Sequence, residues 1–280
     1  LVTSLAIGAA PASAQKSAPD TLARIKSAQR INVAFSGDSP PFSFVDDAHR
    51  PAGYSIDVCR RVIARIGNDL GIADLPVNWI VGSVAERLAM IAAGKADLDC
   101  ANTSESLSRL ETVDFSNRIF IDAGGLLVKS DSRIDRLADL ASRKIGVIKG
   151  TTTETRLNEI LKDHGVNATV VTVREGPEGA AMLASGSLDA FASDKIKLVG
   201  LAAMAANPDA YRMLAEDISF EPYALAIARG DAAMRLAVNR TLSRLSATGE
   251  IDAIFKYWLG ALGRPGGLLA AMYVLNTIPQ

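Results

Sequence analysis

Two stretches, Met90-Ile91-Ala92-Ala93-Gly94-Lys95-Ala96-Asp97 and Met182-Leu183-Ala184-Ser185-Gly186-Ser187-Leu188-Asp189, carry one pattern at the same spacing. Each predicts the end of a helix, a glycine that caps it, and then a short strand. Junctions of this kind are common, so the match by itself leaves coincidence open. Because the apolar, glycine and aspartate positions all agree, we favour a chain built as two similar lobes.

Outward from these stretches, short strand-like runs alternate with helical patterns, which indicates α/β architecture. We expect strands at 30–35, 77–81, 144–148, 168–173 and 224–228, and helices at 56–66, 84–93, 153–164, 231–248, 251–259 and 268–275. In open α/β sheets, ligands bind beyond the carboxyl ends of the strands, so two facing sheets would form a ligand cleft.

The composition limits the number of domains and the classes of partner that the chain can have. Its 280 residues suffice for two domains of about 100–150 residues each, and 49% of them are hydrophobic. The formal net charge is −1, so there is no electrostatic reason to expect nucleic acid or an anionic membrane surface as a partner.

The first residues indicate export. An apolar run over 1–10 is followed by Pro11-Ala12-Ser13-Ala14-Gln15, which is typical of a signal peptide cleaved after Ala14. We expect residues 1–14 to be the remnant of that signal and the mature protein to work in the periplasm; a short buried helix is the alternative. No later run reaches the about 18–20 apolar residues that cross a bilayer.

The two cysteines, Cys59 and Cys100, allow two interpretations. In an exported protein they permit a disulfide within one lobe, which we favour over two buried thiols. Their spacing is not that of a metal or redox site.

A candidate anion site follows one of the expected strands, at Asn102-Thr103-Ser104-Glu105-Ser106-Leu107-Ser108-Arg109. Amide and hydroxyl groups can donate hydrogen bonds to a carboxylate, and the guanidinium of Arg109 can bind it through two N–H groups. A capped helix start with a surface arginine explains the same residues equally well.

Two further stretches could complete such a site. Gly150-Thr151-Thr152-Thr153-Glu154 opens a helix, with Thr151 and Glu154 spaced as a capping box, and the free N–H groups there suit an anion. Asp194 ends a strand and could bind an ammonium group, although a plain turn aspartate is the commoner case. A cation site opposite an anion site is what a zwitterionic amino acid requires.

Signatures of enzymes are missing. The two histidines, His49 and His164, lie in polar contexts that indicate surface positions, and no nucleophile, zinc or dinucleotide motif occurs. We expect no cofactor and no metal.

Taken together, the chain resembles the bacterial extracellular solute-binding proteins, family 3, the amino-acid-binding subunits of ABC importers. The resemblance rests on Pro41-Phe42-Ser43-Phe44, Gly53-Tyr54-Ser55-Ile56-Asp57, Gly94–Leu98, Asn102–Ser116, Gly150-Thr151-Thr152, Ser185-Gly186 and Phe220-Glu221-Pro222-Tyr223. It implies a two-lobed periplasmic-binding-protein type II fold with two hinge crossings, near 122–124 and 221–223. Lobe 1 would comprise 20–122 with 223–280, and lobe 2 would comprise 123–222.

The resemblance also implies roles for residues. Arg109, Ser104 and the backbone of Thr151 and Thr152 would hold the α-carboxylate of the ligand, with Asn102 beside them. Asp194 would hold its α-ammonium, and Tyr54 would line the pocket.

The sequence does not identify the side chain of the ligand. Relatives that bind glutamate or aspartate commonly grip the distal carboxylate with two arginines and a histidine; Arg87 matches one arginine, whereas Ser36 and Gly176 stand at the other two positions. Ser39 stands where other branches stack an aromatic ring on the ligand. Arg87 also fits a solvated helix residue.

The resulting expectation is a monomeric binding protein that captures an amino-acid-like small molecule and delivers it to an ABC transporter permease. A periplasmic cyclohexadienyl dehydratase-like enzyme and a ligand-sensing domain are the alternatives. The tail at 265–280 is expected to pack onto a lobe.

Overall fold

The computed structural model describes residues 20–279, so the expected signal segment at 1–14 lies outside the described residues. The helices are α1 (Thr21–Ala28), α2 (Tyr54–Leu70), α3 (Val84–Ala92), α4 (Thr152–Asp163), α5 (Gly176–Ser185), α6 (Lys195–Ala203), α7 (Ala232–Ala247), α8 (Glu250–Leu259) and α9 (Gly267–Leu275). The strands are β1 (Ile31–Phe35), β2 (Asp38–Ser39), β3 (Ser43–Val45), β4 (Pro51–Ala52), β5 (Val77–Val81), β6 (Leu98–Asp99), β7 (Val113–Lys129), β8 (Lys144–Ile148), β9 (Thr169–Val173), β10 (Ala190–Asp194), β11 (Tyr211–Met213) and β12 (Ser219–Ala228). None of the helices in this part of the chain is long and apolar enough to span a bilayer.

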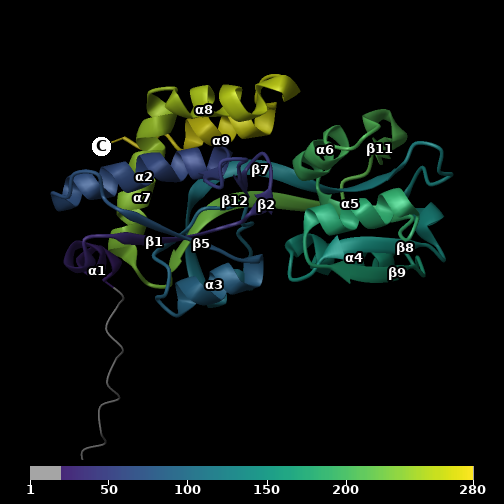
Figure 1. The fold of residues 1–280 in the computed structure, drawn as a ribbon, viewed down its shortest axis with the longest axis horizontal. Helices are drawn as coiled ribbons and strands as arrows, with labels where there is room; N and C mark the ends of the chain where they lie inside the picture. The colour runs from purple at the N-terminus through teal and green to yellow at the C-terminus, as the bar shows by residue number, and fades with distance from the viewer. Residues whose placement is uncertain (1–19, 280) are drawn as a thin grey trace, which may run out of the picture.

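The molecule has two α/β lobes, as expected (Figure 1). The main sheet has the order β5-β1-β6-β12-β7-β10-β8-β9, with β11 paired to β7. In lobe 1, β1 lies between its parallel neighbours β5 and β6; in lobe 2, β8 lies between its parallel neighbours β9 and β10. In each lobe the strand that comes first of these three along the chain therefore lies between the other two. The repeat seen in the sequence thus extends to the order of these strands.

The two matching stretches form the same junction in both lobes. Gly94 follows α3 with φ +67° and Gly186 caps α5 with φ +79°, a left-handed backbone that glycine adopts without steric cost. The aspartate after each glycine then accepts a hydrogen bond from the central parallel strand of its lobe, β1 or β8. Asp97 Oδ2 lies 2.7 Å from the N–H nitrogen of Asn32, and Asp189 Oδ2 lies 2.8 Å from that of Lys144.

The chain passes between the lobes along β7 and β12, which run side by side across the middle of Figure 1. These strands pair antiparallel, with Glu221 opposite Asp122 and Tyr223 opposite Phe120. The large apolar clusters separate on either side of this pairing: one is built from chain up to Phe120 and after Tyr223, the other from chain between Leu126 and Ile218. This separation supports the proposed lobe boundaries at 122 and 222.

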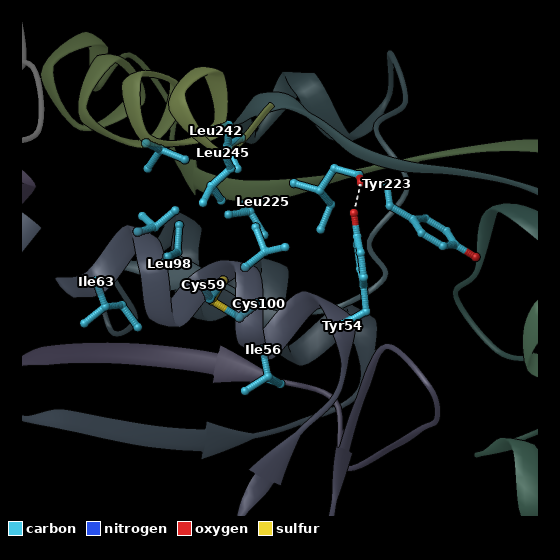
Figure 2. Close-up of a cluster of buried hydrophobic side chains, with 14 of the residues drawn as sticks. Tyr54, Ile56, Cys59, Ile63, Leu98, Cys100, Tyr223, Leu225, Leu242 and Leu245 are labelled. Carbon is cyan, nitrogen blue, oxygen red and sulfur yellow. Dashed lines mark hydrogen bonds between the residues drawn. A yellow bond between two sulfur atoms is a disulfide. The ribbon is translucent and has the colours of Figure 1, made fainter. Parts of the chain in front are cut away.

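The core of lobe 1 is cross-linked by a disulfide between Cys59 of α2 and Cys100, with a Cα–Cα distance of 6.0 Å (Figure 2). Both residues are fully buried among apolar side chains of α2, β6 and α7. The disulfide expected from the sequence is therefore present, and the alternative of two thiols is excluded. The tail also packs as expected, because Leu269, Met272 and Tyr273 of α9 join this core.

Two element boundaries differ from expectation by more than two residues. The helix expected to end near Gly67 continues to Leu70, and Gly71 caps it instead. Gly67 serves a close approach, since a Cβ at this residue would lie 2.9 Å from the carbonyl oxygen of Ile72. The strand expected from 224 begins at Ser219, because the residues before it pair with β7.

Candidate functional site

A small pocket opens where the two lobes face each other, next to the ends of β1, β6, β8 and β10. Its cavity measures about 70 Å³. It is lined by Ser36, Asp38, Ser39, Ser83, Val84, Arg87, Asn102, Ser104, Arg109, Ile148, Lys149, Thr151, Thr152, Arg174, Ser193, Asp194 and Lys197. Seven of the eight residues expected at the site are among them, drawn from both lobes.

The lobes touch across this pocket. Asn102 Nδ2 of lobe 1 donates to Asp194 Oδ2 of lobe 2 at 2.8 Å, and the N–H of Gly176 donates to Asp38 Oδ2 at 3.4 Å. Arg109 adds a third contact, from its guanidinium to the carbonyl oxygen of Gly150 at 3.3 Å. The structure therefore describes a closed arrangement of the two lobes.

Arg109 lies between the lobes rather than on the surface. One guanidinium nitrogen donates to the carbonyl oxygen of Ser104 at 2.7 Å, which fixes the side chain against its own loop. Burial lowers the pKa of Arg109, and the negative charge of Glu221 opposes that effect; an arginine stays charged nevertheless. Of its five N–H groups, two are committed to the contacts with protein carbonyls, so the fork retains donors for a ligand.

The N-terminus of α4 faces Arg109. Thr151 caps the helix, because its Oγ1 accepts from the N–H of Glu154 at 3.1 Å. The capping box also predicted a hydrogen bond from the N–H of Thr151 to the side chain of Glu154, and this prediction is wrong. Glu154 Oε2 accepts from the N–H of Gly150 instead, at 2.6 Å. Within residues 20–279, the backbone N–H groups of Thr151 and Thr152 have no protein acceptor. Together with the helix dipole, these groups suit an anion.

Glu221, on β12, lies beside residues of the pocket, and it was given no role from the sequence. Its carboxylate is fully buried and accepts hydroxyl hydrogen bonds from both lobes. Ser104 and Ser219 donate from the hinge side, and Thr152 and Thr153 donate from α4, at 2.5 Å for Thr152 and 3.3 Å for Thr153. In this arrangement the hydroxyl of Ser104, expected to bind a ligand carboxylate, donates to the carboxylate of Glu221 instead, as does the hydroxyl of Thr152.

Three carboxylates meet behind the pocket: Asp122, Asp194 and Glu221. Burial, together with the charge of Asp194, raises the pKa of Asp122 to about 7. The same two causes raise the pKa of Glu221, against the effect of its hydroxyl donors. Negative charge is therefore concentrated on this side of the pocket, where a ligand cation would offset it.

Arg87, on α3, is neither a solvated helix residue nor an unoccupied cation. Its side chain is 4% exposed and pairs with the fully buried Asp99, with 2.8 Å between Nε and Oδ1. Further nitrogens donate to the carbonyl oxygen of Gly82 at 2.8 Å and to Thr103 Oγ1 at 3.1 Å. Asp99 thus neutralises the positive charge of Arg87, which the sequence had suggested as a partner for a distal carboxylate of the ligand.

Tyr54 lies away from the pocket, and its expected role there is wrong. The ring is fully buried in the core of lobe 1 (Figure 2). Its hydroxyl donates to the carbonyl oxygen of Ile119 at 2.7 Å and lies 2.9 Å from the hydroxyl of Tyr273. The aromatic residue expected to face a ligand instead ties α2 to β7 and α9.

Several residues that line the pocket were not expected there from the sequence, or were noted only because relatives have a different residue at that position. Ser36 and Ser39 are buried and share a hydrogen bond of 2.9 Å between their hydroxyls. Asp38 accepts from Ser36 at 2.7 Å. Lys197 lies on the first turn of α6 and is 7% exposed. It follows Asp194 by three residues, and this short separation in the sequence could have indicated that Lys197 lies near the site.

The chain was compared with known proteins. The family model described as bacterial extracellular solute-binding proteins, family 3, matches residues 31–261. An L-glutamate/L-aspartate-binding protein of Pseudomonas aeruginosa is 30% identical over 249 residues, 89% of this chain and 82% of that protein. A glutamate/aspartate import solute-binding protein of Escherichia coli K12 is 27% identical, over 92% of this chain and 86% of that protein.

Among solved structures, the solute receptor for L-cysteine of Neisseria gonorrhoeae superposes with a TM-score of 0.76 and 26% identity. The match covers 86% of this chain and 94% of that one. The similarity thus extends over both lobes and the pocket between them.

Proposed function

The chain belongs to the bacterial extracellular solute-binding proteins, family 3, and we propose that it captures an L-amino acid, or a closely related small molecule, between its lobes. One observation carries the proposal: an arginine of lobe 1 and an unoccupied helix N-terminus of lobe 2 line a single pocket with Asp194. Arg109 and the N–H groups of Thr151 and Thr152 would bind the α-carboxylate. Asp194 would bind the α-ammonium, with Asn102 holding its carboxylate in position.

Ligand binding would replace the internal contacts of the closed form with better ones. A carboxylate beside Arg109 would meet a charged fork and a helix N-terminus, both of which strengthen hydrogen bonds to anions. The hydroxyls of Ser104 and Thr152 lie close enough to turn from Glu221 toward such a group. Their present bonds to Glu221 keep them ordered in the meantime.

The decisive experiment is calorimetry of the purified chain against a panel of L-amino acids, with the same titrations on Arg109→Ala. We expect one or a few amino acids to bind the unaltered protein and the variant to lose at least about a hundredfold in affinity, since a buried carboxylate would lose its charged partner. Arg156→Ala is the matched control, because Arg156 is an exposed arginine paired with Glu159 on α4. Equal affinity of the Arg109 variant and the control would refute the assigned site.

We further propose that the captured molecule is handed to the permease of an ABC transporter and that the protein works as a monomer in the periplasm. The named relatives and the buried Cys59–Cys100 disulfide support this, since such cross-links persist in oxidising compartments. Light scattering of the eluted protein tests the monomer, and a pulldown with membranes from its own source tests the permease.

Binding without chemistry is the favoured interpretation over a dehydratase. A dehydratase needs a general acid or base at the substrate. Both histidines, His49 and His164, are exposed and outside the pocket, and the nearby carboxylates of Asp194 and Glu221 already accept hydrogen bonds from protein groups. Incubation with prephenate or arogenate, followed for loss of substrate, separates the two. Turnover would overturn the proposal.

A further inference from the structure

Lys197 is a largely buried residue that lines the pocket with Arg109 and Asp194. It lies in the first turn of α6 and is 93% buried as a whole residue. Its ammonium group keeps access to solvent, and among residues 20–279 no carboxylate lies within 4.0 Å of it. Its neighbour Lys195, two residues earlier, shows the ordinary outcome, because that ammonium pairs with Asp217.

A lysine in this position is unusual without a negative charge beside it. Lysine is among the residue types least often buried in proteins, and the buried ones are paired as a rule. A bound anion would supply the missing partner at the wall of the pocket.

The other charges of the pocket are either committed to protein partners or lie at its exposed rim, as Lys149 does. Arg87 is neutralised by Asp99, and Arg174 lies on the rim, paired with Glu178. Asp38 accepts from Ser36 and from the N–H of Gly176. Lys197 is thus the buried cation of this pocket that remains for a ligand once Arg109 holds the α-carboxylate.

We propose, building on the proposed function, that the ligand is an amino acid with a second anionic group and that Lys197 binds this group from lobe 2. This assigns the distal end of the ligand to an ammonium on α6 instead of to the arginine on α3 that the sequence suggested. The buried hydroxyls of Ser36 and Ser39, which already bond each other at 2.9 Å, would bound the same end of the pocket.

The test compares matched acid and amide ligands. L-Glutamate and L-aspartate, with L-glutamine and L-asparagine, are titrated by calorimetry into the unaltered chain, Lys197→Gln and Lys197→Arg. We expect an acid to bind the unaltered chain at least about tenfold more tightly than its amide. Lys197→Gln should abolish that preference while changing the affinity for the amide less than about threefold, and Lys197→Arg should keep much of the preference.

Lys162→Gln is the matched control, since it removes the same charge from an exposed position in the last turn of α4. It should leave the acid-to-amide ratio unchanged, which separates a contact with the ligand from a change in net charge. Cooperative thermal unfolding of each variant shows that it is folded.

The outcomes separate the two proposals. Binding of neutral amino acids in preference to acids by the unaltered chain, or an unchanged acid-to-amide ratio in folded Lys197→Gln, overturns the assignment of Lys197 while leaving the proposed function intact. Failure of every amino acid, neutral or acidic, to bind the unaltered chain overturns both.

Discussion

Lobe 1 and lobe 2 repeat one strand order and one helix–glycine–strand junction, yet they secure that junction differently. In lobe 1 the aspartate is 2% exposed and pairs with Arg24, and a disulfide follows three residues later at Cys100. In lobe 2 the corresponding Asp189 is 34% exposed and pairs with Arg143 at 3.4 Å, with no cross-link behind it. We therefore interpret lobe 1 as the more rigid base, because its junction is more deeply buried and lies beside a disulfide.

The disulfide offers the largest test of this difference. Replacing both Cys59 and Cys100 by alanine frees a loop with a sequence separation of 41, and the chain-entropy model gives a cost of about 4 kcal/mol. We expect this loss of unfolding free energy in urea titrations, with ligand affinity changed less because neither cysteine lines the pocket. A change below about 1 kcal/mol would contradict the rigid-base interpretation.

The meeting point of the lobes gives the next test, through pH. Asp122 accepts from the N–H of Ile196 in lobe 2, at 3.2 Å, and from the hydroxyl of Tyr223, at 3.3 Å. Its pKa of about 7 lies above the ordinary 3.8, so the folded state binds a proton that the unfolded state has released between these values. Stability should therefore fall as the pH rises through that window and level off above it.

Between pH 5 and pH 8 this loss amounts to roughly 2 to 3 kcal/mol for Asp122. Asp122→Asn should flatten the slope of stability against pH by that amount, whatever its effect at any single pH. Asp46→Asn is the control, since Asp46 has its pKa lowered by hydrogen bonds within an exposed turn. Parallel slopes for the unaltered chain and Asp122→Asn would show that the junction does not hold this proton.

The paired aspartates give the smallest effects and the sharpest comparison. Asp97→Asn removes a buried charge from Arg24 and weakens the bond to the N–H of Asn32, at a cost of about 2 kcal/mol. Asp189→Asn removes the corresponding charge in lobe 2, where water can solvate the groups left without a partner. Its cost in unfolding free energy should be below about 1 kcal/mol. Equal losses in chemical denaturation would mean that the two junctions are equivalent in energy as well as in shape.

Sequence patterns predicted several local elements well, but they gave no strand at β7, which spans Val113–Lys129. The strands at 77–81 and 144–148 have the expected bounds, because a short apolar run carries its own signal. The end of α2 was misjudged at Gly67, since a glycine that allows close packing resembles one that ends a helix. Both glycine junctions were found because a left-handed backbone demands that residue.

The pocket was predictable in membership and less so in detail. Asn102, Arg109 and Asp194 follow strands, and such positions converge in α/β folds. The pairing of Arg87 with Asp99 and the burial of Tyr54 against Ile119 and Tyr273 depend on contacts that no local pattern encodes. Glu221 was overlooked for the same reason, because its four hydroxyl donors come from three separate parts of the chain.

Strand β12 has a consequence for how the chain is made. It lies between β6 and β7, although 119 residues separate the end of β6 at Asp99 from its first residue, Ser219. At about 5–20 residues per second, a growing chain waits roughly 6 to 25 seconds for that strand. Lobe 2, whose strands β8 to β10 are already complete by then, is able to fold first. The edge of β6 and the apolar face of α2 remain uncovered meanwhile, and they are the surfaces that most need protection before synthesis ends.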